Sequence, residues 1–249
     1  SNAKMAYSVN LAQYQADVEN GGLLCYVPEG YRYIKNLLVY LSADAQMKIK
    51  NQTRAVTARQ LTLHSTLAAL ENLKQNPADD TDAEQKNREA LTALSESLQG
   101  EIDRMTSDLQ TLTDTLFAAL QPRVDQLLAK IDAGADFDQL IEEDGEDPDA
   151  LIEPVKTTGY LVCAASTMWV PEFTEYSMAL AHVGDISGPF RTRYGVHIVQ
   201  YASDLASGEI PLAQVHDAIK AELLADKQDE AYRAQVEQWV ANATAAAAQ

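Results

Sequence analysis

The sequence predicts an α+β fold, in which a small antiparallel sheet is interrupted by a long helical hairpin and followed by a C-terminal helix. Three observations predict it. Short runs rich in β-branched residues lie both near the start of the chain and in its second half. Between them, residues 43–120 are almost entirely helix-forming, with apolar residues that recur every seven positions in the first part and every three or four in the second. The last 40 or so residues again have helical periodicity.

The first elements are short. Ser1-Asn2-Ala3 looks like the scar of a cleaved tag and is set aside. Residues Tyr7–Asn20 are expected to form a short helix. A turn at Pro28-Glu29-Gly30 then leads into a strand over about Tyr33–Leu41.

A helical hairpin is expected over residues 43–121. Its two arms flank the Pro- and Asp-containing loop 76–82, which favours an antiparallel arrangement. The simplest interpretation is that the Leu residues pack against each other and carry no chemistry. The hairpin as a whole is also a candidate arm for gripping a client or a second copy of the chain. The apolar positions are Ile49, Val56, Leu63 and Leu70 in the first arm, and Leu91, Leu94, Leu98, Ile102, Met105, Leu109, Leu112 and Leu116 in the second.

After Pro122 a helix is expected to end at Gly134, because glycine takes the left-handed conformation that often follows a helix with least strain. The acidic segment, defined as Glu142–Glu153, is most simply a solvated face. Gly159–Val162 is expected to be the second strand.

The segment Trp169–Tyr201 carries the densest pattern. Phe173, Tyr176, Ser177 and Leu180 share one helical face. A Gly184-Asp185 turn follows, and then a strand in which Phe190, Thr192 and Tyr194 alternate with Arg191 and Arg193. The run Val196–Val199 suits a buried strand that carries His197.

The C-terminal segment, from Ile210 to about Ala241, is expected to be one amphipathic helix. Its apolar stripe is formed by Val215, Ile219, Leu223, Leu224, Tyr232, Val236 and Trp239.

Composition excludes several classes of function. A formal net charge of -18 argues against nucleic acid and anionic membranes as partners, because Lys and Arg carry phosphate binding. Cys25 and Cys163 have no CxxC spacing, so the sequence indicates neither a metal site nor a disulfide framework, and a single bridge between them stays open. No apolar run approaches the roughly 18 residues of a membrane span.

The order of motifs in the second half resembles that of a parvulin-type (PpiC/rotamase) peptidyl-prolyl cis/trans isomerase domain. The motifs are Phe173, the GDISGP turn at 184–189 and the YGVHIV strand at 194–199. Ala133-Gly134-Ala135-Asp136-Phe137 is similar to the link into the family's second helix. Pro28-Glu29 and Asn36–Val39 match its first strand, with Asn36 in place of the family's histidine.

The resemblance implies a parvulin-like antiparallel four-stranded sheet with flanking helices. It divides the chain into an N-terminal helical remnant of a chaperone module at 4–32, a parvulin-like domain at 33–42 and 122–204, the inserted hairpin at 43–121, and a C-terminal chaperone-type helix at 205–249. Together these parts resemble extracytoplasmic foldases of the PrsA and SurA kind.

The resemblance also implies a site. Rotation about a peptide bond meets a barrier of ~18–20 kcal/mol, and catalysis needs an apolar slot for proline and polar groups that favour the twisted amide. It needs no nucleophile, metal or cofactor. The implied slot is Leu161, Met168, Trp169 and Phe173, and the implied polar set is Asn36, Asp147, Thr192, Tyr194 and His197, with Asp149 competing for the place of Asp147.

Each of these residues also has a structural interpretation. Phe173 and Leu161 suit an ordinary core, Trp169 a surface wedge, and Thr192 and Tyr194 a strand. A lone His197 suits a core hydrogen bond. Only their joint spacing favours a site.

The resemblance implies a peptidyl-prolyl isomerase and foldase for exported proteins, acting on unfolded or proline-containing clients outside the cytoplasm. A lipid anchor would lie in a segment outside this sequence. We expect reduced activity, because Asn36 cannot carry a proton. The alternative is a non-catalytic holdase that keeps the fold as a peptide-binding scaffold. A third interpretation makes the hairpin a homodimerisation arm.

Overall fold

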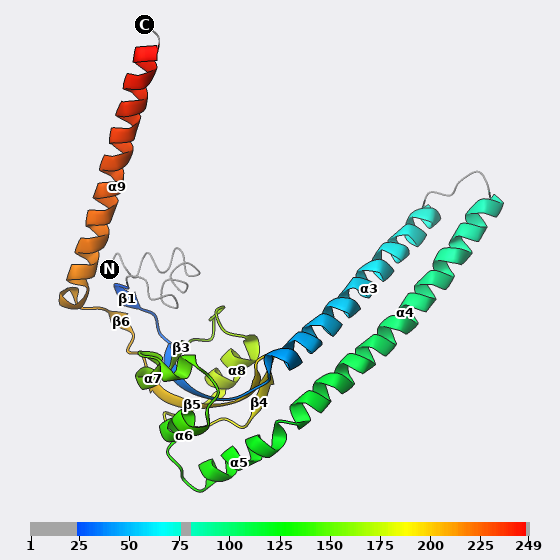
Figure 1. Ribbon diagram of the computed structural model, residues 1–249, viewed down its shortest axis with the longest axis horizontal. Helices are drawn as coiled ribbons and strands as arrows, with labels where there is room; N and C mark the ends of the chain where they lie inside the picture. Colours follow the sequence, from blue (N-terminus) through cyan, green and yellow to red (C-terminus); the bar gives the residue numbers. More distant parts are fainter. Residues whose placement is uncertain (1–23, 76–80, 248–249) are drawn as a thin grey trace. The chain divides into compact units, whose positions relative to one another are not determined.

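The computed structural model describes residues 24–75 and 81–247 (Figure 1). The expected N-terminal helix at Tyr7–Asn20 lies outside the described residues. The described elements are β1 (Tyr26–Val27), β2 (Arg32–Tyr40), α3 (Ala43–Gln75), α4 (Thr81–Ala118), α5 (Gln121–Asp132), α6 (Phe137–Asp144), the 3₁₀ turn η1 (Asp149–Leu151), α7 (Val155–Thr158), β3 (Tyr160–Val162), α8 (Pro171–Ala179), β4 (Phe190–Thr192), β5 (Gly195–Asp204), β6 (Gly208–Glu209) and α9 (Leu212–Ala247).

A four-stranded sheet with the order β3-β2-β5-β4 is the centre of the fold, and its β2/β3 and β4/β5 pairs are antiparallel. The prediction of an α+β fold with such a sheet is confirmed. The chain divides into two compact units, each described here by itself. The first unit comprises residues 1–35, 154–187 and 200–249, and the second comprises 36–153 and 188–199.

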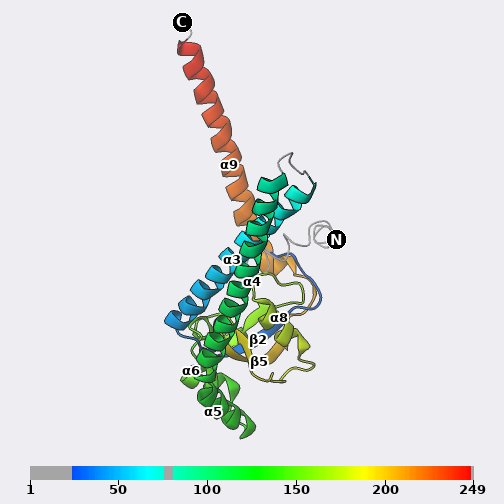
Figure 2. The ribbon, with the colours of Figure 1, turned by 90° about the vertical axis from the view of Figure 1, so that its right-hand side faces the viewer.

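In the second unit, α3 and α4 lie side by side as the predicted hairpin (Figures 1 and 2). Val56, Leu98 and Ile102 are buried between the arms. The predicted stripe is only partly buried, because Leu94 is 46% exposed. A hairpin of two helices has a narrow shared seam, so an apolar residue one position off it faces solvent.

The short helices α5 and α6 complete this unit as the sequence predicts. Gly134 follows α5 with a φ of +82°, the left-handed conformation expected there. The Asp136 side chain caps α6 by accepting a hydrogen bond from the Gln139 amide at 2.9 Å. Val124 and Leu127 of α5 are buried, as is Phe137 of α6.

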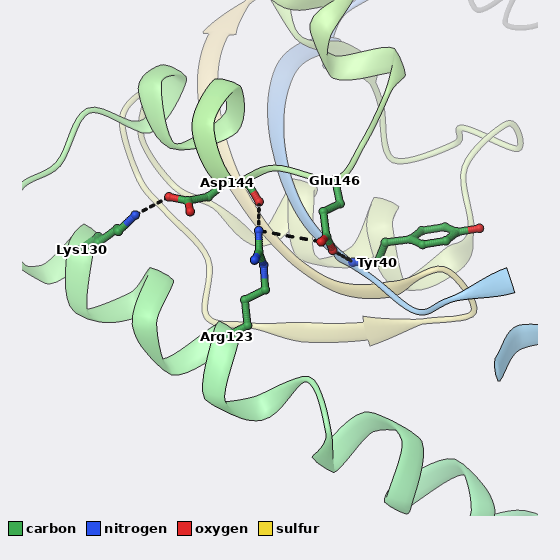
Figure 3. A network of polar contacts seen from close by, with 5 residues as sticks. All are labelled: Tyr40, Arg123, Lys130, Asp144 and Glu146. Atoms are coloured by element: carbon green, nitrogen blue, oxygen red, sulfur yellow. Dashed lines mark hydrogen bonds and ion pairs between the residues drawn. The ribbon is translucent and has the colours of Figure 1, made fainter. Parts of the chain in front are cut away.

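The acidic segment is not simply solvated, which corrects the sequence-based expectation (Figure 3). Glu146 accepts a hydrogen bond from the Tyr40 amide at 2.7 Å and lies 3.8 Å from the Arg123 guanidinium. Arg123 also donates to the Asp144 carbonyl at 2.8 Å, and Lys130 forms an ion pair with the Asp144 carboxylate. Two cations of α5 therefore hold the start of the acidic segment against the end of β2.

In the first unit, α8 buries Phe173 and Ser177, one helical turn apart. Tyr176, expected on the same face, is 40% exposed, because a helix of nine residues presents only a narrow stripe to the core. The short antiparallel pair formed by β1 and β6 was not predicted from the sequence.

The C-terminal helix α9 also belongs to the first unit. Val215 is buried, and Ile219 and Val236 are half-buried. The rest of the expected apolar stripe is exposed, at 55–65% for Leu223, Leu224, Tyr232 and Trp239. Among the described helices, none has the length and apolar character needed to cross a membrane.

Candidate functional site

A chain of buried polar side chains runs across three strands and the acidic segment in the second unit. The Nδ1 atom of His197 on β5 lies 3.0 Å from Oδ1 of Asn36 on β2, and its Nε2 atom lies 2.8 Å from Oγ1 of Thr192 on β4. Asn36 Nδ2 donates to Asp147 Oδ2 at 2.6 Å. We call these four residues the polar relay.

The strand register places these residues together. In the β4/β5 pair, Phe190 lies opposite His197 and Thr192 lies opposite Gly195. The Phe190 ring stacks on the imidazole with centroids 5.4 Å apart and planes 16° apart. His197, Asn36 and Thr192 are each 5% exposed or less.

Every hydrogen bond of the relay has a fixed direction. A carboxylate only accepts, so Asn36 must present its NH₂ group to Asp147 and its carbonyl oxygen to His197. Nδ1 of His197 therefore carries the proton, and Nε2 accepts the hydroxyl proton of Thr192.

Backbone amides close both ends of the relay. The Tyr194 N–H donates to Thr192 Oγ1 at 3.1 Å, and the Asp149 N–H donates to Asp147 Oδ1 at 3.2 Å. Asp149 thus contributes a backbone donor, and the carboxylate at the end of the relay is that of Asp147.

The imidazole is neutral in this arrangement. Burial lowers the pKa of His197 from 6.5 to about 4, against a smaller opposing effect of the Asp147 carboxylate, which favours the protonated ring. Both ring nitrogens are engaged, so the ring is a poor candidate for proton transfer. The relay can instead provide hydrogen-bond dipoles of fixed direction around a neutral imidazole.

Tyr194 lies just beyond the strand whose alternating pattern it was expected to continue. The strand β4 ends at Thr192, and Tyr194 lies in the turn before β5 with its side chain 39% exposed. Its backbone N–H bonds Thr192 of the relay. The guanidinium carbon of Arg193 lies over its ring, 4.8 Å from the centroid. The alternating pattern had been extended across a turn.

The turn itself is held tightly. The Leu41 N–H donates to the Tyr194 carbonyl at 2.7 Å. Gly195 has a φ of +151°, and a Cβ atom there would lie 2.1 Å from the Val39 carbonyl oxygen. Only glycine fits at this close approach of β5 to β2.

The apolar set lies in the first unit. The Trp169 and Phe173 rings are 5.7 Å apart, and the Trp169 indole N–H donates to the Leu161 carbonyl at 2.9 Å. Tyr160, which the sequence analysis missed, contacts both rings with centroids 5.1 Å from Trp169 and 6.1 Å from Phe173. Tyr160 lies at the start of β3, next to Leu161, and this position in the sequence could have indicated that it belongs with the apolar set.

The members of the apolar set differ in exposure. Phe173 is 5% exposed, while Leu161 and Trp169 are half-buried. Met168 is 45% exposed. Within residues 24–75 and 81–247, no three His, Cys, Asp or Glu side chains are grouped as metal ligands would be.

Comparison with known proteins places the relay in a family context. Residues 113–203 match the family model described as Rotamase, the PPIC-type PPIase domain. Two Clostridium botulinum proteins, each named foldase protein PrsA, are 30% identical to this chain over 112 residues. Each match covers 44% of this chain and 32% of the relative, so the chain spans about a third of the length of these relatives.

A solved structure of a peptidyl-prolyl isomerase (PrsA) from Bacillus anthracis is also similar, with 18% identity and a TM-score of 0.30. The match covers 74% of this chain and 84% of that structure.

Proposed function

From the match of residues 113–203 to the PPIC-type PPIase domain, we propose that this chain is a peptidyl-prolyl cis/trans isomerase of the parvulin type. The observation that carries the proposal is the polar relay. It connects β2, β4 and β5 to the acidic segment and leaves the imidazole neutral and fixed. Three of its members, His197, Thr192 and Asp147, lie within the family match.

The chemistry of such a reaction suits the relay. Prolyl isomerisation breaks no covalent bond, and the slow step is loss of amide resonance. A catalyst therefore gains by offering fixed dipoles that interact better with the twisted amide than with the planar one. A relay with oriented hydrogen bonds supplies such dipoles without reorganising during the reaction.

The proline ring needs an apolar surface. We assign this role to Leu161, Trp169 and Phe173, with Met168 at its exposed rim. The cluster of Trp169, Phe173 and Tyr160 supports the assignment, because edge-on aromatic contacts fix the ring positions.

The relatives' name, foldase protein PrsA, supports a role in protein folding. We propose that the protein assists the folding of exported polypeptides outside the cytoplasm, as a foldase whose clients are unfolded or proline-containing chains. The net charge of -18 supports clients that are not strongly acidic overall. Nucleic acid is not among the proposed partners, for the same reason.

The direct test is isomerisation of a short alanine-proline peptide, followed by NMR exchange spectroscopy. We expect the chain to increase the exchange rate, and Asn36→His to increase it further by restoring the histidine that the family resemblance implies. Equal rates for the two forms would remove the argument that Asn36 limits activity. No detectable rate in either form would contradict the proposed catalysis.

A second candidate function is that of a non-catalytic holdase. One observation favours it: Asn36 completes the relay with hydrogen bonds on both sides and cannot exchange a proton. A holdase would suppress the aggregation of a client that lacks proline, in the absence of any isomerase activity. An isomerase without holdase function would leave such a client unprotected.

We also propose that the hairpin of α3 and α4 is a contact arm, for a client or for a second copy. Large apolar side chains are exposed along it, with Met47 at 53%, Leu61 at 67% and Leu67 at 48%. Sedimentation and client aggregation of a variant without the hairpin test this role. If neither changes, the hairpin is only a spacer.

A further inference from the structure

We propose that Arg193, held against the ring of Tyr194, selects clients with an acidic side chain beside the proline. This inference rests on the proposed isomerase function and adds a substrate preference to it. The two residues form the turn between β4 and β5, directly after relay residue Thr192. We call this pair the Arg–Tyr turn.

The guanidinium of Arg193 is fixed in place by its neighbour. Its Nη2 donates to the Tyr194 hydroxyl at 2.7 Å, and its carbon lies 4.8 Å from the centre of the Tyr194 ring. Both side chains are exposed. A guanidinium has five N–H donors, so a group stacked on a ring keeps donors for a carboxylate.

The neighbouring arginine shows the contrast. Arg191 forms an ion pair with Asp114 at 3.0 Å and lies over the Phe117 ring at 4.8 Å, so its charge is already matched. Within the described part of the chain, no carboxylate forms an ion pair with Arg193. The charge of Arg193 is therefore available to an acidic side chain of a client at a position directly after relay residue Thr192.

The turn is tied to the relay by its backbone. The Tyr194 N–H donates to Thr192 Oγ1, and Thr192 in turn bonds His197. The Leu41 N–H holds the Tyr194 carbonyl. A client residue that contacts Arg193 would therefore be positioned relative to the relay by a fixed turn.

The overall negative charge does not oppose this preference at close range. The Debye length at physiological ionic strength is about 8 Å, so the distant carboxylates are largely screened from a bound side chain. A direct contact with the guanidinium is screened less. We therefore expect the charge of the whole protein to affect client association, and Arg193 to affect the choice of residue beside proline.

The test compares peptides that differ only in the residue before proline, with Glu, Gln or Lys at that position. NMR exchange gives kcat/KM for each peptide on the same sample of the full chain. The ratio of kcat/KM for the Glu peptide to that for the Gln peptide does not depend on the folded fraction, because the concentration of active protein cancels. We expect a ratio of about five, the upper effect of an exposed ion pair, and a ratio below one for Lys against Gln. Arg193→Gln should bring the Glu-to-Gln ratio to about one, and Arg193→Glu should invert it.

Arg104→Gln is the matched control. Arg104 is an exposed arginine on α4 that donates to the Gly100 carbonyl and, like Arg193, forms no ion pair with a described carboxylate. It lies 14 residues before Ala118, about 21 Å along the helix at 1.5 Å per residue. This variant loses the same charge and should keep the ratio of about five.

The outcomes separate the two proposals. Activity with equal rates for Glu and Gln peptides would overturn the role of Arg193 and leave the isomerase function standing. A ratio that falls equally in Arg193→Gln and Arg104→Gln would also overturn it, because net charge would then be the cause. Absence of isomerisation with every peptide would contradict the proposed function, and this inference with it.

Discussion

His197 donates its Nδ1 proton to the side-chain oxygen of Asn36 across 3.0 Å, and this one bond fixes the tautomer of the imidazole. Asn36 can accept only because its NH₂ group is turned toward Asp147. The carboxylate therefore determines, through an amide, which nitrogen of a buried histidine carries the proton.

Removal of the Asn36 side chain should destabilise the fold. Asn36→Ala leaves the Nδ1–H of His197 without its acceptor in a buried position, which costs about 1–3 kcal/mol. Urea unfolding followed by circular dichroism measures this loss. Asn51→Ala, at an exposed position on α3, is the control and should stay within about 0.5 kcal/mol of the parent. Equal stabilities of the two variants would contradict the relay.

Thr192 should need its hydroxyl group and not merely its shape. Thr192→Val removes the donor to His197 Nε2 and the acceptor of the Tyr194 N–H, so we expect a loss of about 1–3 kcal/mol. Thr192→Ser keeps the hydroxyl and should lose less. Thr111→Val, on an exposed face of α4, is the control: it makes the same substitution where the hydroxyl has no buried partner, so it should lose less stability than Thr192→Val. A Thr192→Val variant as stable as Thr192→Ser would rule out the proposed bond directions.

Stability should fall in acid because His197 is neutral in the folded state. Its pKa is lowered from 6.5 to about 4, so the unfolded chain binds more protons between these values. The contribution of the neutral His197 to the free energy of unfolding is complete above about pH 7. It is lost as the pH falls through 6.5 toward 4. Between about pH 7.5 and pH 4.5 it amounts to about 2–3 kcal/mol.

Carboxylates also titrate in this range, so the comparison must isolate the histidine. His197→Gln can donate and accept hydrogen bonds but does not titrate. Urea unfolding at both pH values should show a smaller acid loss for this variant than for the parent. Identical losses would mean that His197 keeps an ordinary pKa in the folded protein.

The cations of α5 should affect local order more than global stability. Arg123 and Lys130 are about half exposed, and such ion pairs contribute about 0–1 kcal/mol each. The double change Arg123→Gln and Lys130→Gln should speed hydrogen exchange at the Glu146 amide, which donates to the Leu38 carbonyl at 3.0 Å. Exchange at the amide of Leu37, which is buried near the middle of β2, is the internal reference. Unchanged exchange at Glu146 would show that these cations do not hold the segment.

Trp169 should report proline binding if the apolar set is the proline slot. Trp239 is the other tryptophan of the chain and is 59% exposed on α9, so Trp239→Phe leaves Trp169 as the single tryptophan, which can be excited selectively over the tyrosines. A proline peptide should change the Trp169 fluorescence with saturation, while the same peptide with alanine in place of proline should not. Equal responses to both peptides would argue against a proline-specific surface.

The sequence predicted most elements, because strong periodicity and turn residues mark them. It placed His197, Asn36 and Thr192 on strands, and it placed the left-handed Gly134 after a helix, both as the structure has them. The error at Tyr194 arose because a period of two continues only as long as the strand does. The strand β4 ends at Thr192, and Tyr194 lies in the turn before Gly195 with its side chain 39% exposed.

Long-range polar contacts could not be predicted from local pattern. Glu146 and Asp144 belong to a run of like charges, and nothing in that run distinguishes residues that meet Arg123 and Lys130 from residues that face water. The pairing of Arg191 with Asp114 spans 77 positions in the sequence and depends on the tertiary fold. The contacts of Tyr160 with Trp169 and Phe173 also depend on the tertiary fold and could not be predicted from the local sequence.

The hairpin has a consequence for how this chain can change in length. It is joined to β2 through Leu41 and Ser42 and to α5 through Ala119 and Leu120, and its first arm alone extends about 50 Å at 1.5 Å per residue. The ion pair between Arg59 and Glu101, at 3.1 Å, shows that these two residues lie side by side on α3 and α4. Nearer the sheet, Asp114 of α4 forms an ion pair with Arg191 of β4. Equal lengths could therefore be removed from or added to both arms beyond Arg59 and Glu101 without altering either joint. The reach of the arm is a dimension that evolution or an engineer can adjust independently of the sheet.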